Sequence, residues 1–593
     1  MDLSRSLRDA AAAPRRPVTL IEALARLPED PDRGFRFVGF GPAERHISWG
    51  ELRLETGRRA ACLAALGFAP GDRLAIALSD GAEFVSSFLG AVRAGVVPAP
   101  LPPPPLLNRS FGSYRESVSR VLASARARAL LTSEDARAAF QPLSSEEAAG
   151  GTPPVLSVET AFRGPASVFE APPIGPGDLC FLQFTSGSTA TPRGVMVTHG
   201  NLAANLEAFG GPAGFGPKRP EDVIVSWLPL YHDMGLIGIV LGALYHDVPT
   251  VILSTSSFGR DPRIWLKTIH RHRGTITYAP NFAYALVTRR LRDADLSGLD
   301  LSCLRVAGCG AEPIQAATLR DFAARLEPAG FRSEAFLPSY GMAEATLAVT
   351  LHPRGTPPVT DRVDAEALGR GDARPAEEAS GRVAEVVSCG PVLPGHELAI
   401  RGVSGEILPD RRVGEITVRG PSIASGYWDA EAANAQTWRG GWLHTGDLGY
   451  TAAGNLFVCG RVKEVIVVRG ANFYPQDIEW ALRDLPGVRR GNVAAFGVDG
   501  PQGEELALAV EVEGRANGDL RQRIASRVWE AAGLEIARIA LVPPGTLPRT
   551  SSGKMRRSKV KRLFETGDLP EIEPAGASPE ETAGAGAGTG TED

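Results

Sequence analysis

The sequence predicts an α/β protein with a large N-terminal domain of two doubly wound βα subdomains and a small α+β C-terminal domain. Short apolar runs, many of them rich in β-branched residues, alternate along the chain with segments long enough to form helices. This alternation is typical of βαβ units in a parallel sheet. Five runs lie in the middle of the chain, and earlier runs at residues 74–78 and 130–132 indicate a second βα subdomain.

Each of the five central runs ends in a cluster of small, polar or Gly/Pro residues. Ligands bind beyond the carboxyl ends of the strands in such sheets. We therefore expect the five clusters to form one site. The runs are residues 180–184, 223–227, 275–278, 304–307 and 335–337.

The pattern changes after the fifth run. Short alternating runs between Gly, Pro and Asp indicate antiparallel β structure at residues 386–458, and a smaller βα pattern resumes at residue 465. We expect an N-terminal domain at 1–460 and a C-terminal domain at 461–570. Residues 571–593 contain almost nothing to bury, which predicts a disordered tail.

Composition narrows the functional class. The 593 residues are 43% hydrophobic and 22% charged, which is ordinary for a globular protein of several domains. A formal net charge of -5 gives no reason to expect a nucleic-acid partner. The six cysteines form no CxxC pair. No apolar run is long enough to span a membrane. Residues 1–16 lack the apolar core of a secretory signal peptide. We therefore expect a cytoplasmic protein without a transmembrane segment.

A loop rich in glycine and hydroxyl residues follows the first central run. Glycine lets successive backbone N–H groups converge on a phosphate, hydroxyls add donors, and an arginine adds charge. The Walker A pattern does not fit this loop. Taken alone, these residues leave a phosphate site and an ordinary loop equally open. The residues of this loop that could bind phosphate are Thr185, Ser186, Gly187, Ser188, Thr189 and Arg193.

Residues 184–196 resemble the signature loop of the adenylate-forming superfamily, which includes acyl-CoA synthetases, adenylation domains of nonribosomal peptide synthetases and luciferases. Further motifs follow in that superfamily's order, and the resemblance spans roughly residues 19–563. It implies that the β-rich segment forms a small β-barrel-like subdomain and that the C-terminal domain is mobile. The motifs lie at 340–344, 414–416, 442–447, 460–464 and 547–554.

Two runs, at residues 226–236 and 472–479, resemble the fatty acyl-AMP ligase branch in particular. The stretch at about 351–385 resembles the insertion of that branch, although a variable surface loop would look the same. Two positions depart from the superfamily pattern. Ala190 stands where glycine is usual, and Arg193 stands where lysine is usual. Arginine keeps the charge.

The resemblance implies a nucleotide site. The loop of Thr185–Thr189, with Arg193, would hold the β- and γ-phosphates of ATP, and Glu344 would bind Mg²⁺. Tyr340 would stack on adenine, and Asp447, helped by Arg461, would bind the ribose hydroxyls. A core tyrosine and a turn aspartate are the ordinary alternatives. Further residues expected at the nucleotide are Gly310, Ala311, Glu312, Pro313, Ser339, Gly341, Met342 and Ala343.

Lys554 matches the catalytic lysine of the superfamily. A point charge on a flexible stem suits a carboxylate oxygen and the α-phosphate together, whereas a lysine in a basic tail would be the alternative. Lys463 matches the hinge about which the small domain rotates after adenylation. His232 matches a position near the acyl group, although a buried, hydrogen-bonded histidine is a fair alternative.

The acyl pocket cannot be sized from the sequence. Its candidates are Trp227, Leu236, Ile237 and Phe282, each of which is more often a core residue.

Three functions remain open. The first is a fatty acyl-AMP ligase, which uses ATP and Mg²⁺ and releases pyrophosphate. It then passes the acyl group in trans to the phosphopantetheine of an acyl carrier protein, for polyketide, lipopeptide or lipid biosynthesis. The second is a fatty acyl-CoA ligase with free coenzyme A as acceptor. The third is a non-catalytic homologue, against which the intact Glu344, Asp447, Arg461 and Lys554 count.

Overall fold

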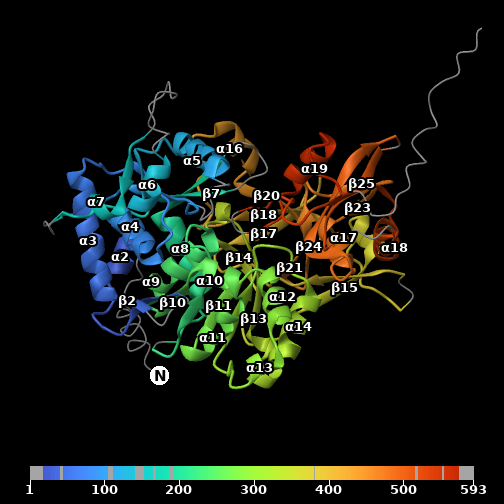
Figure 1. Ribbon diagram of the computed structural model, residues 1–593, viewed down its shortest axis with the longest axis horizontal. Coiled ribbons are helices and arrows are strands. Elements are labelled where there is room, and N and C mark those ends of the chain that lie inside the picture. Colours follow the sequence, from blue (N-terminus) through green and yellow to red (C-terminus); the bar gives the residue numbers. More distant parts are fainter. Residues whose placement is uncertain are drawn as a thin grey trace, which may run out of the picture. The chain divides into compact units, whose positions relative to one another are not determined.

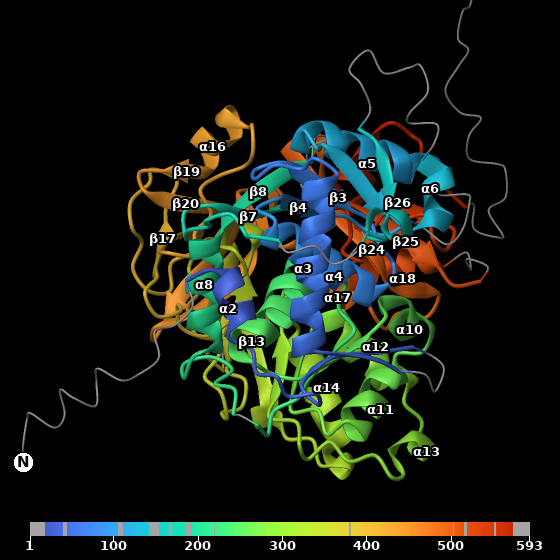
Figure 2. The same cartoon turned by 90° about the vertical axis from the view of Figure 1, so that its left-hand side faces the viewer.

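The chain divides into two compact units. The first comprises residues 1–361, 385–445 and 449–458, and the second comprises residues 362–384, 446–448 and 459–593. Figures 1 and 2 show the elements of both units in two orientations. The computed structural model describes residues 18–39, 44–104, 111–140, 153–164, 169–185, 192–218, 220–378, 381–501, 503–514, 519–550 and 553–572.

An eight-stranded sheet forms the centre of the first unit. Six neighbouring strands run parallel, and the edge strands β14 and β2 run antiparallel to their partners. Four of the five predicted runs coincide with parallel strands of this sheet. In sheet order, the strands are β14 (Ala348–Leu351), β13 (Phe336–Gly341), β12 (Val306–Cys309), β11 (Ile276–Ala279), β9 (Ile224–Ser226), β10 (Thr250–Leu253), β1 (Gly34–Val38) and β2 (Glu44–Ser48).

Helices connect the parallel strands, as the βαβ pattern predicts. In Figure 1, α12 and α14 lie beside β11 and β13. The helices of this half are α8 (His199–Gly210), α9 (Gly242–His246), α10 (Thr255–Arg260), α11 (Arg263–Arg271), α12 (Asn281–Arg290), α13 (Asp293–Leu296) and α14 (Ala316–Leu326).

A second parallel sheet confirms the expectation of two βα subdomains. Its order is β4 (Val97–Pro100), β3 (Arg73–Ile76), β5 (Ala129–Thr132) and β6 (Val155–Ser157). In Figure 2, α3 (Trp49–Ala65) and α4 (Gly81–Arg93) lie beside β3 and β4. Asp80 begins α4 by accepting a 2.9 Å hydrogen bond from the Glu83 amide. The remaining helices of the first unit are α2 (Leu20–Ala25), α5 (Phe111–Ala125), α6 (Glu134–Phe140), α7 (Val158–Ala161) and α16 (Glu431–Thr437).

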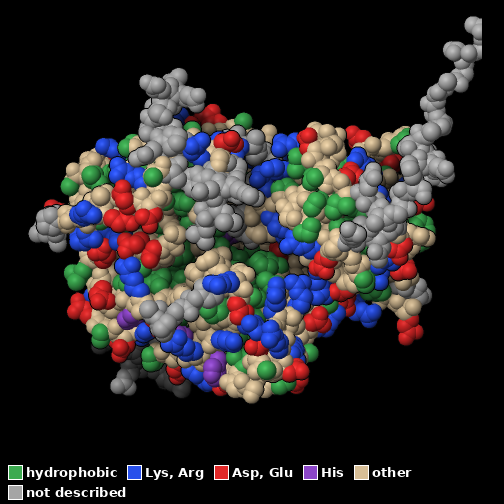
Figure 3. All heavy atoms as spheres, viewed as in Figure 1, with side chains coloured by type: hydrophobic (Ala, Val, Ile, Leu, Met, Phe, Trp, Pro, Cys, Tyr) green, Lys and Arg blue, Asp and Glu red, His purple; other side chains and the backbone are tan. Residues whose placement is uncertain are grey.

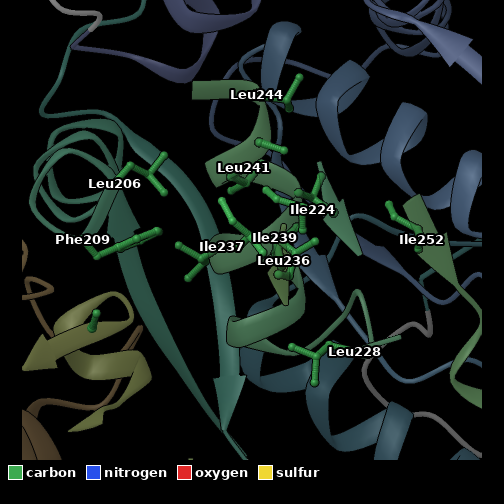
Figure 4. Close-up of a cluster of buried hydrophobic side chains, with 14 of the residues drawn as sticks. Leu206, Phe209, Ile224, Leu228, Leu236, Ile237, Ile239, Leu241, Leu244 and Ile252 are labelled. Atoms are coloured by element: carbon green, nitrogen blue, oxygen red, sulfur yellow. The ribbon is translucent and has the colours of Figure 1, made fainter. Parts of the chain in front are cut away.

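Buried aliphatic side chains join the strands to the helices that cover them. Figure 4 shows such side chains converging from α8, β9, β10, α9 and the π-helix η3 (Met234–Leu241). Seven of the eight η3 residues, all except Met234, are buried, so an entirely apolar helix is stable there. π-Helical turns are rare in proteins, and those that do occur are often found at functional sites.

The first of the five central runs does not enter the parallel sheet. β7 (Leu179–Thr185) instead pairs antiparallel with β8 (Arg193–Thr198) as a two-stranded hairpin. Gly194 lies close to Phe184, because a Cβ there would lie 2.9 Å from the Phe184 ring and the ring would have to shift. The predicted βα unit is therefore wrong at this run, since a short apolar run does not reveal the direction of its partner.

The predicted β-rich segment forms an antiparallel sheet. Its path is β17 (Glu397–Arg401), β18 (Gly414–Arg419), β20 (Trp442–Ala452) and β19 (Trp438–Arg439), and β21 (Asn455–Arg461) pairs with β20. Tyr450 stacks on Phe457 across this sheet, with ring centroids 5.0 Å apart.

Among its described residues, the second unit contains a three-stranded sheet, the two-stranded pair of β22 and β23, and four helices. β24 (Val488–Gly500) pairs antiparallel with β25 (Gly503–Val512), which pairs parallel with β26 (Ile536–Val542). Ile572, inside the predicted tail, donates its amide to Leu541 and packs on the core of this unit. The remaining elements are α15 (Ala365–Gly369), β22 (Ile466–Val468), β23 (Ala471–Phe473), α17 (Pro475–Ala481), α18 (Leu520–Ala532) and α19 (Arg557–Glu565).

The predicted insertion contains the strand β15 (Thr360–Asp364) and ends within β16 (Val383–Val387). Its residues 362–384 belong to the second unit. There a Cβ on Gly369, at the end of α15, would lie 3.0 Å from the Asn472 carbonyl of β23. Arg382 donates to the Ala531 carbonyl of α18 at 3.4 Å.

Among the helices of the described residues, none is long and apolar enough to cross a membrane.

Candidate functional site

The carboxyl ends of β12 and β13 bring two of the predicted clusters together. Gly310 follows β12 and lies against Ser339 of β13, where a Cβ on Gly310 would be 2.7 Å from Ser339 Oγ. Ala311 has φ +68, a left-handed conformation that turns the chain sharply after the strand. Glu312 accepts a 2.5 Å hydrogen bond from the Phe282 amide in the first turn of α12. The loop of residues 310–313 is thus fixed to its neighbours on both sides.

Tyr278 is a residue of this edge that the sequence analysis missed. It lies on β11, and its hydroxyl contacts Ser339 Oγ across β12. The intervening strand carries Gly308, where any Cβ would lie 1.9 Å from the Tyr278 ring. A glycine in the middle of a strand is a signal of such a close approach, and it could have indicated this contact.

Tyr340, Gly341 and Met342 close the edge at the end of β13. Tyr340 is buried and its hydroxyl lies 3.9 Å from Met342 Sδ. Gly341 lies against the returning strand, because a Cβ there would be 2.0 Å from the Leu347 carbonyl oxygen. This packing holds the Tyr340 backbone at the strand end where adenine is expected.

Glu344 is a nearly buried carboxylate in the 3-10 turn of Ala343–Ala345, with 8% of its surface exposed. Its Oε1 accepts a 2.7 Å hydrogen bond from the Tyr427 hydroxyl, and its carbonyl accepts from the Ala424 amide at 2.9 Å. Burial of a charged carboxylate is costly unless donors or a cation compensate it.

A polar network fixes the turn that carries Glu344. Asn205 of α8, which is fully buried, donates to the Ala348 carbonyl at 2.8 Å and to Ser422 Oγ at 3.0 Å. Its own Oδ1 accepts from the Ala348 amide at 3.1 Å. Thr346 has φ +69 and donates to the Ser422 carbonyl at 2.6 Å. The strained backbone beside Glu344 is therefore held by partners on three segments.

Two residues of the predicted phosphate loop lie in described strands. Thr185 is the last residue of β7 and pairs with Arg193, the first residue of β8. The Arg193 guanidinium lies 5.3 Å from the centroid of the Tyr427 ring. Ser186, Gly187, Ser188, Thr189 and Ala190 lie outside the described residues.

His232 and the predicted acyl-pocket residues lie beyond β9. His232 Nδ1 contacts Asp233 Oδ1, and Asp233 begins η3 by accepting from the Met234 amide at 2.8 Å. Trp227 is buried and stacks on Phe258 with centroids 3.7 Å apart.

Leu236 and Ile237 are fully buried in η3, and Phe282 packs against the same core. All four pocket candidates lie where hydrophobic core residues would lie. Packing does not account for the polar indole N–H of Trp227, which has no hydrogen-bond partner among the described residues.

In the second unit, Asp447 and Arg461 form an ion pair. Arg461 Nε lies 3.0 Å from Asp447 Oδ1, and only 6% of Asp447 is exposed. A backbone hydrogen bond of 2.9 Å from Val462 to Gly446 joins the same two segments. Lys463 follows in an exposed turn.

Lys554 lies at a tight turn of the second unit. Its amide donates to Thr550 Oγ1 at 3.0 Å, and its carbonyl accepts from the Thr550 amide at 2.8 Å. Gly553 has φ +87, which favours glycine and shapes the turn. Lys554 is half-buried.

Arg557, three residues after Lys554, was missed by the sequence analysis. Its guanidinium lies 2.7 Å from Glu464, next to Lys463, and 2.7 Å from Glu479 of α17. These pairs join the start of α19 to α17 and to the segment that follows β21. The basic cluster in the sequence gave no signal that one of its members is committed to structural ion pairs.

The described residues contain no group of three or more His, Cys, Asp or Glu side chains that could hold a metal ion alone. A single carboxylate such as Glu344 suits Mg²⁺, which prefers one or two carboxylates together with phosphate oxygens and water. The face seen in Figure 3 carries both acidic and basic side chains, with acidic ones gathered at the left and basic ones right of centre.

Comparison with known proteins gives consistent matches. The model of the family described as AMP-binding enzyme matches residues 27–428. A Caulobacter vibrioides protein that is provisionally named an acyl-CoA synthetase is 38% identical over 531 residues, covering 88% of this chain and 91% of its own. The long-chain-fatty-acid–AMP ligase FadD26 of Mycobacterium marinum is 37% identical over 519 residues, covering 82% and 86%.

Solved structures agree with these relatives. A structure from a study of fatty acyl-adenylate ligases of E. coli and L. pneumophila superposes with a TM-score of 0.86 at 34% identity. The match covers 93% of this chain and 98% of that chain. Similarity therefore extends over both units.

Proposed function

We infer the function from one premise, that this chain belongs to the AMP-binding enzyme family. It is an adenylate-forming ligase that activates a fatty acid as its acyl-AMP. The observation that carries this conclusion is the match to fatty acyl-AMP ligases over nearly the whole chain. In the structure, the matched residues include a buried Glu344 at the carboxyl edge of the large sheet.

The reaction begins with attack of a fatty acid carboxylate oxygen on the α-phosphorus of ATP. The bond to the β-phosphate breaks, acyl-AMP forms and pyrophosphate leaves. The protein forms no covalent bond in this step. It accelerates the reaction by positioning the carboxylate and ATP and by compensating the negative charge of the phosphates. Mg²⁺, when bound, would neutralise charge on the phosphate oxygens.

The groups of the first unit would hold the nucleotide and its metal. Glu344 fits a Mg²⁺ ligand, because it is a nearly buried carboxylate at the carboxyl edge of the sheet, and the Tyr427 hydroxyl donates to its Oε1 at 2.7 Å. Arg193 would contact the phosphates, and Tyr340 and the loop after β12 would enclose adenine. His232 would lie near the carboxyl group of the fatty acid.

Groups of the second unit would also take part in adenylation. Asp447 would accept hydrogen bonds from the ribose hydroxyls while Arg461 holds its carboxylate. Lys554 would bind a carboxylate oxygen and the α-phosphate, where charge grows in the transition state. Lys463 would serve as the hinge when the acceptor thiol enters.

We further propose that the acceptor is the phosphopantetheine thiol of a carrier protein, encountered in the cytoplasm. Residues 362–384 support this choice, since they pack on β23 and α18 as a folded part of the second unit. The alternative acceptor is free coenzyme A, which the name of the Caulobacter relative favours.

Product analysis separates the two acceptors. Purified protein is mixed with ATP, Mg²⁺ and radiolabelled dodecanoate, alone, with coenzyme A, or with a phosphopantetheinylated carrier protein. We expect acyl-AMP that persists with coenzyme A and is consumed with the carrier. Conversion to acyl-CoA by the wild-type protein would contradict the carrier assignment and leave adenylation intact.

A deletion of residues 365–382 tests the insertion. We expect acyl-CoA to appear with this variant, because the segment that packs on β23 and α18 is gone. Arg382→Ala, which removes only the contact with Ala531, is the milder comparison. An unchanged product pattern in the deletion variant would argue against a role of the insertion in rejecting coenzyme A.

A further inference from the structure

Arg193, Tyr427 and Glu344 come from separate segments of the first unit, and their side chains lie next to one another. The Arg193 guanidinium lies 5.3 Å from the centroid of the Tyr427 ring, and the Tyr427 hydroxyl lies 2.7 Å from Glu344 Oε1. Arg193 begins the strand that leaves the predicted phosphate loop. Tyr427 therefore contacts both the arginine of that loop and the carboxylate expected to bind Mg²⁺.

The Tyr427 backbone is fixed on both sides. Its amide donates to Asn434 Oδ1 at 2.7 Å, and its carbonyl accepts from Asn434 Nδ2 at 2.9 Å. The neighbouring amide of Trp428 donates to the Gly194 carbonyl at 2.8 Å. These bonds tie residue 427 to β8 and to α16, so its side chain starts from a well-defined position.

The Tyr427 side chain has little freedom and one polar contact with a charged group. Only 6% of the residue is exposed, and the Trp438 ring meets its edge with centroids 5.0 Å apart. The Tyr427 hydroxyl donates its hydrogen bond to the Glu344 carboxylate.

We propose that Tyr427 is a positioning residue that orients the Glu344 carboxylate toward Mg²⁺, with Arg193 stacked on its ring. The inference rests on the proposed role of Glu344 in binding Mg²⁺. Hydrogen bonding to Oε1 fixes the rotation of the carboxylate, and outer partners of this kind control how a ligand meets a metal. The planar guanidinium of Arg193 can stack on an aromatic ring, which the ammonium of lysine cannot do in the same way.

A purely structural role for Tyr427 makes a different prediction. If the ring only fills space between Trp438 and β8, loss of the hydroxyl should alter stability without altering metal binding. Tyr450 provides the matched comparison, because its hydroxyl donates to Asp361 Oδ2 at 2.9 Å and the residue is fully buried. Tyr427→Phe and Tyr450→Phe each remove one hydroxyl that donates to a carboxylate.

The experiment measures metal binding without turnover. Mn²⁺ replaces Mg²⁺, and its binding to the full-length protein with α,β-methylene-ATP is followed by electron paramagnetic resonance. We expect Tyr427→Phe to raise the dissociation constant of Mn²⁺ by roughly tenfold, as loss of one charge-assisted hydrogen bond predicts. Tyr450→Phe should leave it unchanged, and thermal unfolding should shift similarly in both variants.

Two further variants separate this inference from the function on which it rests. Glu344→Gln should weaken Mn²⁺ binding more than Tyr427→Phe, and adding Tyr427→Phe to Glu344→Gln should weaken it little more. If Glu344→Gln has no effect, the Mg²⁺ role and the inference both fall. If Glu344→Gln weakens binding while Tyr427→Phe matches Tyr450→Phe, only the positioning role is overturned.

Arg193→Lys tests the stacked arginine. It keeps the charge and removes the planar group, so we expect a smaller rise in the Mn²⁺ dissociation constant than for Tyr427→Phe. An effect of Arg193→Lys that is undiminished in the Tyr427→Phe background would contradict coupling through the ring.

Discussion

Glu344 and Lys554 are both expected to act in adenylation, yet the protein holds them differently. Glu344 is 8% exposed and lies in a strained turn fixed by Asn205, Ser422 and Tyr427. Lys554 lies at a half-buried turn held by backbone bonds to Thr550. A metal ligand gains from rigid support, whereas a group that acts in only one conformational step gains from an accessible position. We therefore expect substitutions around Glu344 to lower the stability of the protein, and substitution of Lys554 to lower its activity.

The largest effect on activity should come from Lys554→Ala. Loss of one charge that stabilises the transition state should lower the rate of acyl-AMP formation by about 10²–10³-fold. The half-buried turn should keep its backbone bonds, so thermal unfolding should change little. Acyl-AMP formation is measured with radiolabelled dodecanoate. Lys559→Ala on α19 serves as the control, and equal losses in both variants would point to a general charge effect.

Asn205→Ala should show the opposite behaviour and mainly destabilise the protein. It removes three donated bonds and one accepted bond in a fully buried network. We expect the free energy of unfolding to fall by about 2–3 kcal/mol, because the Ala348 amide and Ser422 lose a buried partner. Urea unfolding measures this change. A drop below about 0.5 kcal/mol would mean that the turn of Glu344 is held by other contacts.

Acid should destabilise the first unit through His199. Burial lowers the pKa of His199 from 6.5 to about 4, and its Nδ1 accepts from the Leu20 amide at 3.1 Å. The unfolded chain binds a proton below pH 6.5 while folded His199 stays neutral until about pH 4. Its contribution to stability is therefore complete above pH 6.5 and declines as the pH falls toward 4.

His199→Asn tests this pH dependence, since asparagine keeps an acceptor and cannot titrate. Between pH 7 and 5 the wild type should lose about 2 kcal/mol more stability than the variant in urea unfolding. Parallel pH profiles would show that His199 is protonated equally in both states.

The smallest effect on stability should follow Arg461→Gln. The pair with Asp447 has an arginine side chain that is 61% exposed, so its loss should cost under about 0.5 kcal/mol. The KM for ATP should nevertheless rise, because Asp447 loses the group that orients it toward the ribose. Steady-state kinetics tests this split. A large drop in thermal stability with an unchanged KM would reverse the expected contrast.

The sequence predicted local features well and distant contacts poorly. Apolar runs located β11, β12 and β13 to within a few residues, because strand patterns depend on neighbouring positions. The bond between Tyr427 and Glu344 joins positions 83 residues apart, and that between Asn205 and Ser422 joins positions 217 apart. No local pattern reports such pairs.

One prediction of topology was wrong. The hairpin of β7 and β8 was expected as a βα unit, although the alternating residues of β8 follow the loop directly. Residues 362–384 of the predicted insertion pack with the second unit. Both features depend on which partner a segment finds in the folded chain.

Fatty-acid-dependent exchange of radiolabelled pyrophosphate into ATP tests the central claim most directly. The account predicts exchange with dodecanoate in the wild-type protein and its loss in Lys554→Ala, with thermal stability unchanged. Absence of exchange with fatty acids of every tested length, or full exchange in Lys554→Ala, would contradict it.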